Sequence, residues 1–116
     1  MSEAPPLFSV VIPVYNRAEL LRSALESVRA QSCQDFEIVV VDDGSTDDPA
    51  KTVAAFADPR IRCVRQNNRG ASAARNRGIA LARGRFVAFL DSDDCFLPHH
   101  LERMAKLLEN TTDSAG

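Results

Sequence analysis

The sequence has little excess charge of either sign and no long apolar run. Its formal net charge is −2 over 116 residues, which argues against nucleic acid or an anionic membrane surface as the main partner. Its apolar runs are shorter than the about 20 residues that a transmembrane helix needs, so we expect no transmembrane segment. The N-terminal residues Met1–Pro6 are acidic and proline-rich and do not resemble a signal peptide. We therefore expect a cytoplasmic chain, at most attached to the inner face of the membrane.

Cysteine is also scarce. The chain has three cysteines, Cys33, Cys63 and Cys95, which are far apart and include no Cys-x-x-Cys pair. This pattern argues against a zinc site and against a disulfide framework. We expect three small, buried or half-buried thiols in a reducing compartment.

Short apolar segments alternate with amphipathic ones along the chain. The apolar segments predict buried strands, and the period of the segments between them predicts helices. The predicted strands cover residues 7–14, 36–41, 61–65 and 86–90, and the predicted helices cover residues 17–30, 49–56, 71–82 and 98–109. This order is typical of an α/β fold in which a parallel sheet of about four strands has helices on both faces. We expect one Rossmann-like domain over residues 7–109, with disordered ends at residues 1–6 and 110–116.

Local residue types predict where three of these helices begin or end. Asn16 and Glu19 have the spacing of a capping box, so we expect Asn16 to cap the first helix. Gly84 follows the third helix and is expected to end it. Pro98 is expected to open the last helix. The apolar face of that helix contains Leu101, Met104, Ala105 and Leu108.

Polar clusters follow all four predicted strands. In open α/β sheets, ligands bind beyond the carboxyl ends of the strands. The four clusters are Tyr15–Arg17, Asp42–Ser45, Gln66–Arg69 and Asp91–Asp94. Because the carboxyl ends of parallel strands lie at one edge of the sheet, we expect the four clusters to form one site.

The fourth cluster contains three aspartates. In extended backbone Asp91 and Asp93 point the same way, and two nearby carboxylates repel unless a cation lies between them. Oxygen ligands suit Mg²⁺ or Mn²⁺, and such an ion can also bind a diphosphate. We therefore favour a divalent metal site here. The alternative is a polar turn that caps the helix opening at Pro98.

The other clusters allow both a ligand-binding and a structural interpretation. Asp42 and Asp43 can accept hydrogen bonds from a pyrimidine N–H or a ribose hydroxyl, or can form an Asx-type turn at Gly44. Arg75 can reach a base or a diphosphate, or can pair with an aspartate loop. Tyr15, the only tyrosine, can stack on a base or lie half-buried with its hydroxyl in water.

Four motifs in this order resemble those of family 2 glycosyltransferases. They are Ser9–Asn16 (SVVIPVYN), Val41–Asp47 (VDDGSTD), Asn68–Gly70 with Ala74–Asn76 (NRG and ARN), and Leu90–Asp94 (LDSDD). The resemblance covers about residues 8–108. It implies a GT-A fold, a nucleoside-diphosphate-sugar donor, most often a UDP-sugar, and inversion at the anomeric carbon.

The resemblance also implies roles for individual residues. The implied nucleotide-binding residues are Pro13, Tyr15, Asp43, Arg75 and Asp91. Of these, Tyr15 and Asp43 would lie at the base, Arg75 near the base or the diphosphate, and Asp91 at the ribose.

The implied metal ligands are Asp93 and, as a second candidate, Asp94. They would hold the Mg²⁺ or Mn²⁺ that neutralises the leaving diphosphate. In the family, a later half of the chain supplies the acceptor pocket and the general base. No strand-ending carboxylate follows Asp94, so we assign no catalytic residue to this chain and interpret it as a truncated donor-binding half. The acceptor, whether glycan, lipid or protein, is undetermined, and exposed core surface predicts self-association.

Other functions fit parts of the pattern. A dehalogenase-type phosphohydrolase also uses Asp-x-Asp, but on the first strand and followed by Thr, whereas here the motif follows the fourth predicted strand and Cys95 comes after it. A nucleotidyltransferase has a Gly-rich basic loop after the first strand, whereas Pro13–Arg17 contains no Gly. A dinucleotide-binding dehydrogenase is disfavoured because no Gly-x-Gly-x-x-Gly motif follows the first strand. We keep the nucleotidyltransferase and a non-catalytic nucleotide-binding fragment as alternatives. The fragment predicts UDP binding without turnover.

Overall fold

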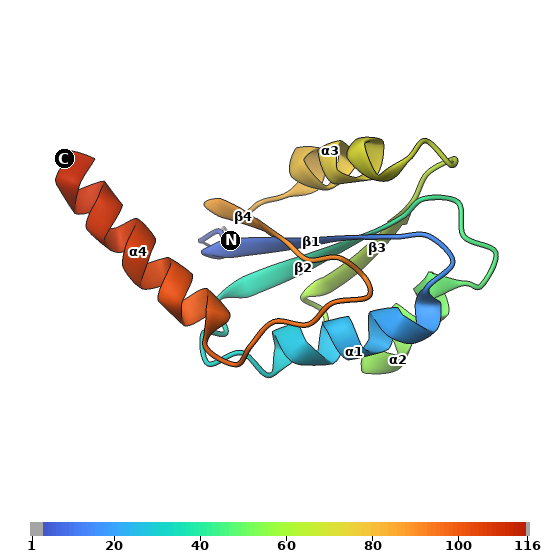
Figure 1. The fold of residues 1–116 in the computed structure, drawn as a ribbon, viewed down its shortest axis with the longest axis horizontal. Helices are drawn as coiled ribbons and strands as arrows, with labels where there is room; N and C mark the ends of the chain where they lie inside the picture. The colour runs from blue at the N-terminus through green and yellow to red at the C-terminus, as the bar shows by residue number, and fades with distance from the viewer. Residues whose placement is uncertain (1–3, 116) are drawn as a thin grey trace.

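The protein folds as an alternating α/β chain, as predicted (Figure 1). The structure, a computed structural model, describes residues 4–115. Its elements are β1 (Phe8–Val14), α1 (Ala18–Arg29), β2 (Phe36–Asp42), α2 (Pro49–Phe56), β3 (Ile61–Arg65), α3 (Ala71–Leu81), β4 (Phe86–Phe89) and α4 (His100–Ala115). Of the predicted disordered ends, residues 1–3 and Gly116 lie outside the described residues.

The four strands form one parallel sheet in the order β3-β2-β1-β4. β2 is buried along its whole length, which suits its run of β-branched residues. β3 is an edge strand, in agreement with its lower apolar content. Because all the strands are parallel, the segments that follow them leave the sheet at the same edge.

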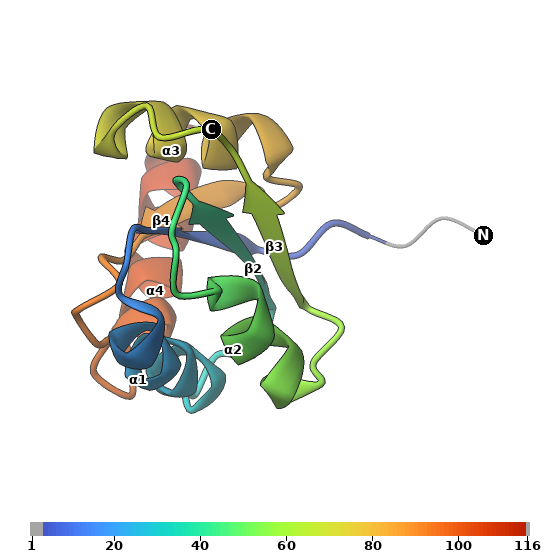
Figure 2. The same cartoon turned by 90° about the vertical axis from the view of Figure 1, so that its right-hand side faces the viewer.

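Helices cover both faces of this sheet (Figures 1 and 2). α1 and α2 lie on one face and α3 lies on the other. The buried residues form a larger and a smaller hydrophobic cluster. The side chains that α1 contributes to the larger cluster, the larger core, are Leu21, Ala24, Leu25 and Val28. α3 approaches the sheet closely because it presents small residues: a Cβ on Gly78 would lie 2.3 Å from Val11 Cγ1. Ala74 is fully buried on the same side of the sheet.

α4 extends away from the sheet beyond its attachment at one end (Figure 1). Leu101 is fully buried, and the rest of the predicted apolar face packs partly buried against the larger core, which confirms that face. The helix begins at His100 rather than at Pro98, because Gln31 fixes its start: Gln31 Nε2 donates to Leu97 O at 2.6 Å and Gln31 Oε1 accepts from Leu101 N at 3.0 Å. The helix continues to Ala115, beyond its predicted end at residue 109.

The predicted helix cap at Asn16 is wrong. Asn16 has a φ of 53°, and its Oδ1 accepts from Thr46 N at 2.7 Å. Instead, Asp47 Oδ2 accepts from Ala18 N at 2.9 Å and stabilises the start of α1 from a neighbouring loop. A contact 29 residues away in sequence has therefore replaced the local capping box.

The predicted helix end at Gly84 is also wrong. α3 ends at Leu81, and Ala82 is its C-cap. Gly84 is needed for a different reason, since a Cβ there would lie 2.7 Å from the backbone of Phe8 and of Ser9. The glycine permits the chain to pass close beside β1 before it enters β4.

Among residues 4–115, no helix combines the length and the apolar character needed to cross a bilayer.

The three cysteines are free. Cys33 and Cys63 are half-buried as expected, but Cys95 is exposed, which corrects the expectation for that residue. Burial raises the pKa of the Cys63 thiol to about 11.

Candidate functional site

A cavity of about 270 Å³ lies at the carboxyl ends of β1, β2 and β4 and beside the start of α3. Its lining residues are Pro13, Val14, Tyr15, Arg17, Asp43, Ala71, Ala74, Arg75, Asp91, Ser92 and Asp93. Six of the seven predicted site residues are in this set, and Asp94 is the exception. The structure thus brings together side chains from three of the four predicted polar clusters and from the start of α3. The remaining cluster, Gln66–Arg69, does not line this cavity; Gln66, Asn67 and Arg69 line a separate hollow, which corrects the expectation of one site for all four clusters.

Asp43 is buried and fastens the loop between β3 and α3. Its carboxylate accepts from Gln66 Nε2, Arg69 N and Gly70 N, each at 2.9 Å. Burial by itself would raise the pKa of Asp43, but these three hydrogen bonds hold it below its ordinary value. A carboxylate offers about four acceptor positions, so about one remains for a ligand in the cavity.

Asp42, the neighbouring aspartate, has a structural role. Its Oδ1 accepts from Ser45 N at 2.8 Å and its Oδ2 accepts from Arg65 Nη1 at 2.9 Å. The turn interpretation is therefore correct for Asp42. Gly44 adopts a φ of 84° at this turn, and a Cβ there would lie 3.0 Å from Asn68 N.

The acidic segment after β4 forms a reverse turn rather than the extended backbone that we expected. Asp94 N donates to Asp91 O at 3.0 Å, with Ser92 and Asp93 at the corner. Short polar residues favour such turns because their side chains compete for backbone hydrogen bonds. Asp91 and Asp93 nevertheless both line the cavity.

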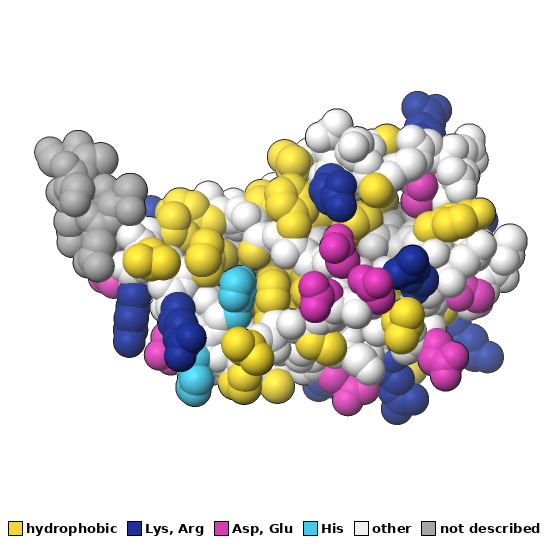
Figure 3. Space-filling view, viewed as in Figure 1, with side chains coloured by type: hydrophobic (Ala, Val, Ile, Leu, Met, Phe, Trp, Pro, Cys, Tyr) yellow, Lys and Arg dark blue, Asp and Glu magenta, His cyan; other side chains and the backbone are white. Residues whose placement is uncertain are grey.

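Each of these two carboxylates faces a guanidinium. Asp93 Oδ2 lies 2.6 Å from Arg17 Nη1, and Asp91 Oδ1 lies 3.6 Å from Arg75 Nη2. The pairing of Arg75 with an aspartate loop agrees with its structural interpretation, while its place in the cavity wall keeps it within the candidate site. Figure 3 shows acidic side chains gathered near the middle of one face, with basic side chains beside them.

Asp94 opens into an adjoining hollow of about 430 Å³. That hollow shares Arg75 and Asp91 with the cavity. Asp94 Oδ1 accepts from Cys95 N at 3.0 Å. The two predicted metal ligands therefore line adjacent hollows rather than one.

The donor set of the acidic turn fits a hard divalent ion held jointly with a ligand. Within the described part of the chain, no group of three or more His, Cys, Asp or Glu residues is arranged to hold a metal ion. Mg²⁺ commonly takes only one or two protein carboxylates, together with substrate phosphates and water. The half-exposed carboxylate of Asp93 is suited to that arrangement and not to a cage made of protein alone.

Sequence reasoning gave Arg17 no role, although Arg17 and Tyr15 both line the cavity. Tyr15 is 48% exposed and lines the cavity, so its position agrees with both of its interpretations, a half-buried ring and a ring that a ligand can reach. Arg17 belongs to the same polar cluster, and its position directly after a strand end was a signal that could have identified it. The small residues Ala71 and Ala74 were missed because alanine has no functional group to mark it.

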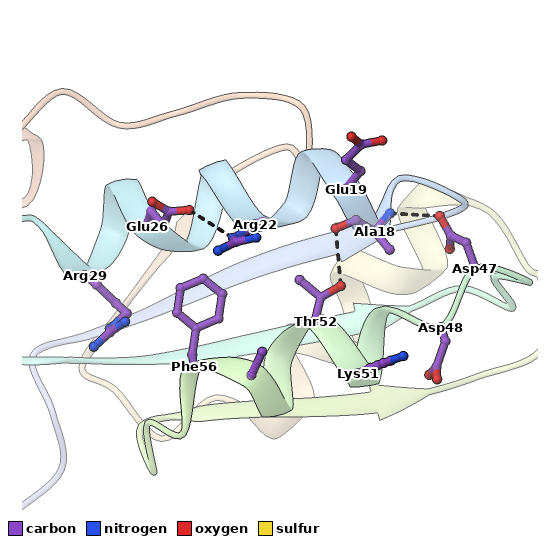
Figure 4. Close-up of a pocket in the computed structure, with 11 residues that line it drawn as sticks. Ala18, Glu19, Arg22, Glu26, Arg29, Asp47, Asp48, Lys51, Thr52 and Phe56 are labelled. Carbon is purple, nitrogen blue, oxygen red and sulfur yellow. Dashed lines mark hydrogen bonds and ion pairs between the residues drawn. The ribbon is translucent and has the colours of Figure 1, made fainter.

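A larger hollow of about 630 Å³ lies between α1 and α2 (Figure 4). None of the predicted site residues lines it. Some of its charged groups already have partners: Arg22 pairs with Glu26 at 3.4 Å, and Asp47 Oδ2 accepts from the backbone N–H of Ala18 at 2.9 Å. The chemistry of the cavity at the strand ends is therefore the better basis for a function.

Several proteins of similar sequence or structure are described as glycosyltransferases. The chain is 48% identical over 102 residues to an uncharacterized glycosyltransferase of Rickettsia felis, which covers 87% of this chain and 17% of that protein. Its fold matches S. aureus TarS 1-349 in complex with UDP-GlcNAc with a TM-score of 0.83 and 32% identity, covering 89% of this chain and 31% of that one. It also matches the mannosyltransferase PcManGT of Pyrobaculum calidifontis, in complex with GDP-Man and Mn²⁺, with a TM-score of 0.71 and 30% identity over 79% of this chain and 29% of that one.

These matches confirm the GT-A fold that the motifs implied. The chain spans about one sixth to one third of the length of the proteins it matches here. The sequence model of glycosyl transferase family 2 matches residues 9–116, nearly the whole chain. This protein therefore belongs to glycosyl transferase family 2.

Proposed function

We propose that this chain forms the donor-binding part of an inverting, metal-dependent glycosyltransferase that uses a UDP-sugar. The observation that supports this most directly is the cavity at the strand ends, which collects Pro13, Tyr15, Asp43, Arg75, Asp91 and Asp93. The complex of TarS with UDP-GlcNAc supports a nucleotide-sugar as the ligand class.

The nucleoside is bound by the β1 and β2 side of the cavity. The exposed ring of Tyr15 offers a stacking surface for the base, and Pro13 lies at the same strand end. Asp43 is held ionised by its three donors, so its remaining acceptor position can receive a base N–H. Arg75 contacts the base or the diphosphate, and Asp91 accepts from a ribose hydroxyl.

The diphosphate is bound beside the acidic turn. Asp93, with Asp94 as the second candidate, holds Mg²⁺ or Mn²⁺, as the oxygen donor set and the Mn²⁺ complex of PcManGT suggest. The bound ion supplies neutralisation of the charge that develops on the leaving diphosphate.

We assign no general base to the described residues. Glu102 lies on α4, where its Oε1 accepts from Ser32 Oγ at 2.9 Å and its Oε2 pairs with Lys106 at 3.6 Å. The acceptor class, whether glycan, lipid or protein, therefore stays open. The cytoplasm is the compartment we propose, because three free cysteines suit a reducing environment.

Calorimetric titration of UDP into the chain tests this function. We expect UDP to bind in the presence of Mn²⁺, and Asp93→Ala to weaken that binding about 10- to 100-fold, because the ion loses a carboxylate ligand. Asp35→Ala is the matched control, since Asp35 is an exposed aspartate before β2, at the opposite end of the sheet. Circular dichroism shows whether each variant is folded.

Two outcomes would contradict the proposal. If the wild-type chain is folded and binds no UDP with or without Mn²⁺, the assignment of a donor site is wrong. If wild type and Asp93→Ala bind UDP with equal affinity, the assignment of Asp93 as a metal ligand is wrong. A parallel titration with GDP tests which base the site prefers. If GDP binds more tightly than UDP, the donor is a GDP-sugar rather than a UDP-sugar.

A further inference from the structure

Arg17 and Asp93 form the shortest ion pair among the described residues, with Nη1 and Oδ2 at 2.6 Å. The two residues are 76 positions apart in sequence, and the pair joins the segment after β1 to the turn after β4. It occupies the same carboxylate that the proposed function gives to the metal ion. A guanidinium and a divalent cation repel each other, so they cannot share one carboxylate oxygen at this distance without cost.

The backbone that carries Arg17 is fixed on both sides. Asn16 N donates to Ser45 Oγ and Ala18 N donates to Asp47 Oδ2, each at 2.9 Å. Arg17 O also accepts the first helical hydrogen bond of α1, from Leu21 N at 2.9 Å. In contrast, the Arg17 side chain is 51% exposed. A long side chain on a rigid anchor can exchange one partner for another within the cavity without moving the loop.

The charges around the cavity leave Arg17 a second possible partner. Two guanidinium groups and three carboxylates line the cavity, so it has one negative charge in excess before any ligand binds. Asp43 is already satisfied by three donors, whereas Asp91 and Asp93 each rely on one arginine. If a divalent ion displaces Arg17 from Asp93, the freed guanidinium is available to donate to an anionic group held by that ion.

We propose that Arg17 and the divalent ion alternate on Asp93. The Arg17 guanidinium neutralises Asp93 while the ion is absent, and it donates to the donor diphosphate when the ion is bound. This inference rests on the proposed function, and it adds a positioning residue that the family resemblance did not supply.

The strength of the ion pair between Arg17 and Asp93 determines how much the affinity for Mn²⁺ should change when the pair is removed. Arg17 and Asp93 are about half exposed, and exposed ion pairs are weak because water screens them. Replacement of Arg17 by glutamine should therefore raise the affinity for Mn²⁺ alone about two- to fivefold, which corresponds to about 0.4–1 kcal/mol. The same replacement should lower the affinity for UDP at saturating Mn²⁺ about three- to tenfold, because a charged donor to the diphosphate is lost.

The experiment measures both affinities in wild type, Arg17→Gln and a control. Free Mn²⁺ is followed by electron paramagnetic resonance without nucleotide, and UDP binding is followed by calorimetry with Mn²⁺ in excess. Arg22→Gln is the control, because it removes the same charge from α1 outside the cavity and breaks only an exposed pair with Glu26. The expected result is two changes of opposite sign in Arg17→Gln and neither change in Arg22→Gln.

The opposite signs separate this proposal from a merely structural tie between two loops. A structural tie predicts that both affinities fall together, and that result would overturn the proposal, as would two unchanged affinities. Failure of either wild type or Arg17→Gln to bind millimolar Mn²⁺ without UDP would also overturn it, since no exchange on Asp93 would then occur. If wild type does not bind UDP at all, that result would instead refute the proposed function.

Discussion

Single carboxylates in this protein are distinguished by their hydrogen-bond donors. Glu37 is buried near the amino ends of the strands and accepts from Ser9 Oγ at 2.5 Å, Arg83 N at 2.6 Å and Arg62 Nη2 at 3.1 Å. Burial by itself would raise the pKa of Glu37, but these donors outweigh it and lower the pKa below 4.5. The ionised side chain links β2 to β1, to β3 and to the segment after α3.

Glu37 should therefore make the protein more stable at neutral pH than in acid. Because its pKa is lower in the folded state, its contribution is fully present above about pH 4.5 and is lost as the pH falls through the lower, folded value. Glu37→Gln should lower the free energy of unfolding by about 1–3 kcal/mol at pH 7, since its amide leaves buried donors unpaired. Urea unfolding at pH 7 and pH 3.5 measures both effects.

An exposed glutamate on α1 provides the control for this prediction. Glu26→Gln should change stability by less than about 0.5 kcal/mol at either pH. The variant Glu37→Gln should also lose less stability than wild type between the two pH values. An equal loss in both proteins would show that Glu37 does not contribute to the acid sensitivity.

At the scale of elements, the identity of each helix and strand was predictable but several ends were not. The apolar period along α1 and along the strands is a local property, so it was visible in the sequence. Asn16 has good capping chemistry, yet its side chain binds Thr46 while Asp47 takes the capping position. Helix ends depend on which distant loop supplies a partner, and the sequence does not show that distance.

The packing of α3 against β1 depends on the absence of a side chain at Gly78. Gly78→Ala would place a Cβ 2.3 Å from Val11 Cγ1. Alanine favours a helix over glycine by about 1 kcal/mol, but overpacking costs about 1–3 kcal/mol, so we expect a net loss of stability of up to about 2 kcal/mol. Thermal or urea unfolding measures the loss.

Two further variants test the cause of this loss. Ser72→Ala, at an exposed position of the same helix, should leave stability unchanged or slightly raised. The double variant Gly78→Ala, Val11→Ala should lose at least about 0.5 kcal/mol less than the sum of the two single losses, because the clash is relieved. Simple additivity would argue against the clash.

For the whole molecule, β4 is the least covered part of the sheet. β4 pairs only with β1 among the described residues, and α3 packs over β1 and β2. Val87 and Phe89 on the uncovered face are 37% and 45% exposed. Exposed apolar side chains on an edge strand favour pairing with another chain.

We accordingly expect the isolated chain to self-associate. Val87→Lys should weaken self-association about tenfold, because a lysine on an edge strand opposes strand pairing. Leu20→Lys, at an exposed site on α1, is the control and should not change it. Sedimentation velocity over a range of concentrations measures the association. A wild-type mass that stays monomeric at all concentrations would contradict the prediction.

The sequence by itself determined the α/β order, the buried strands and the edge of the sheet at which a site must lie. These features follow from local apolar periods and from the rule that parallel strands end on one side. The motifs at the strand ends were sufficient to predict the family and six residues of the cavity wall.

Only the tertiary structure decided what each polar side chain does. Asp42 and Asp43 are adjacent and chemically identical, yet Asp42 binds Ser45 and Arg65 while Asp43 faces the cavity. The pairing of Arg17 with Asp93 was likewise invisible, because its partners are 76 residues apart. Hydrogen bonds and ion pairs depend on distances of a few ångströms, and those distances are set by how the segments pack rather than by their order in the chain.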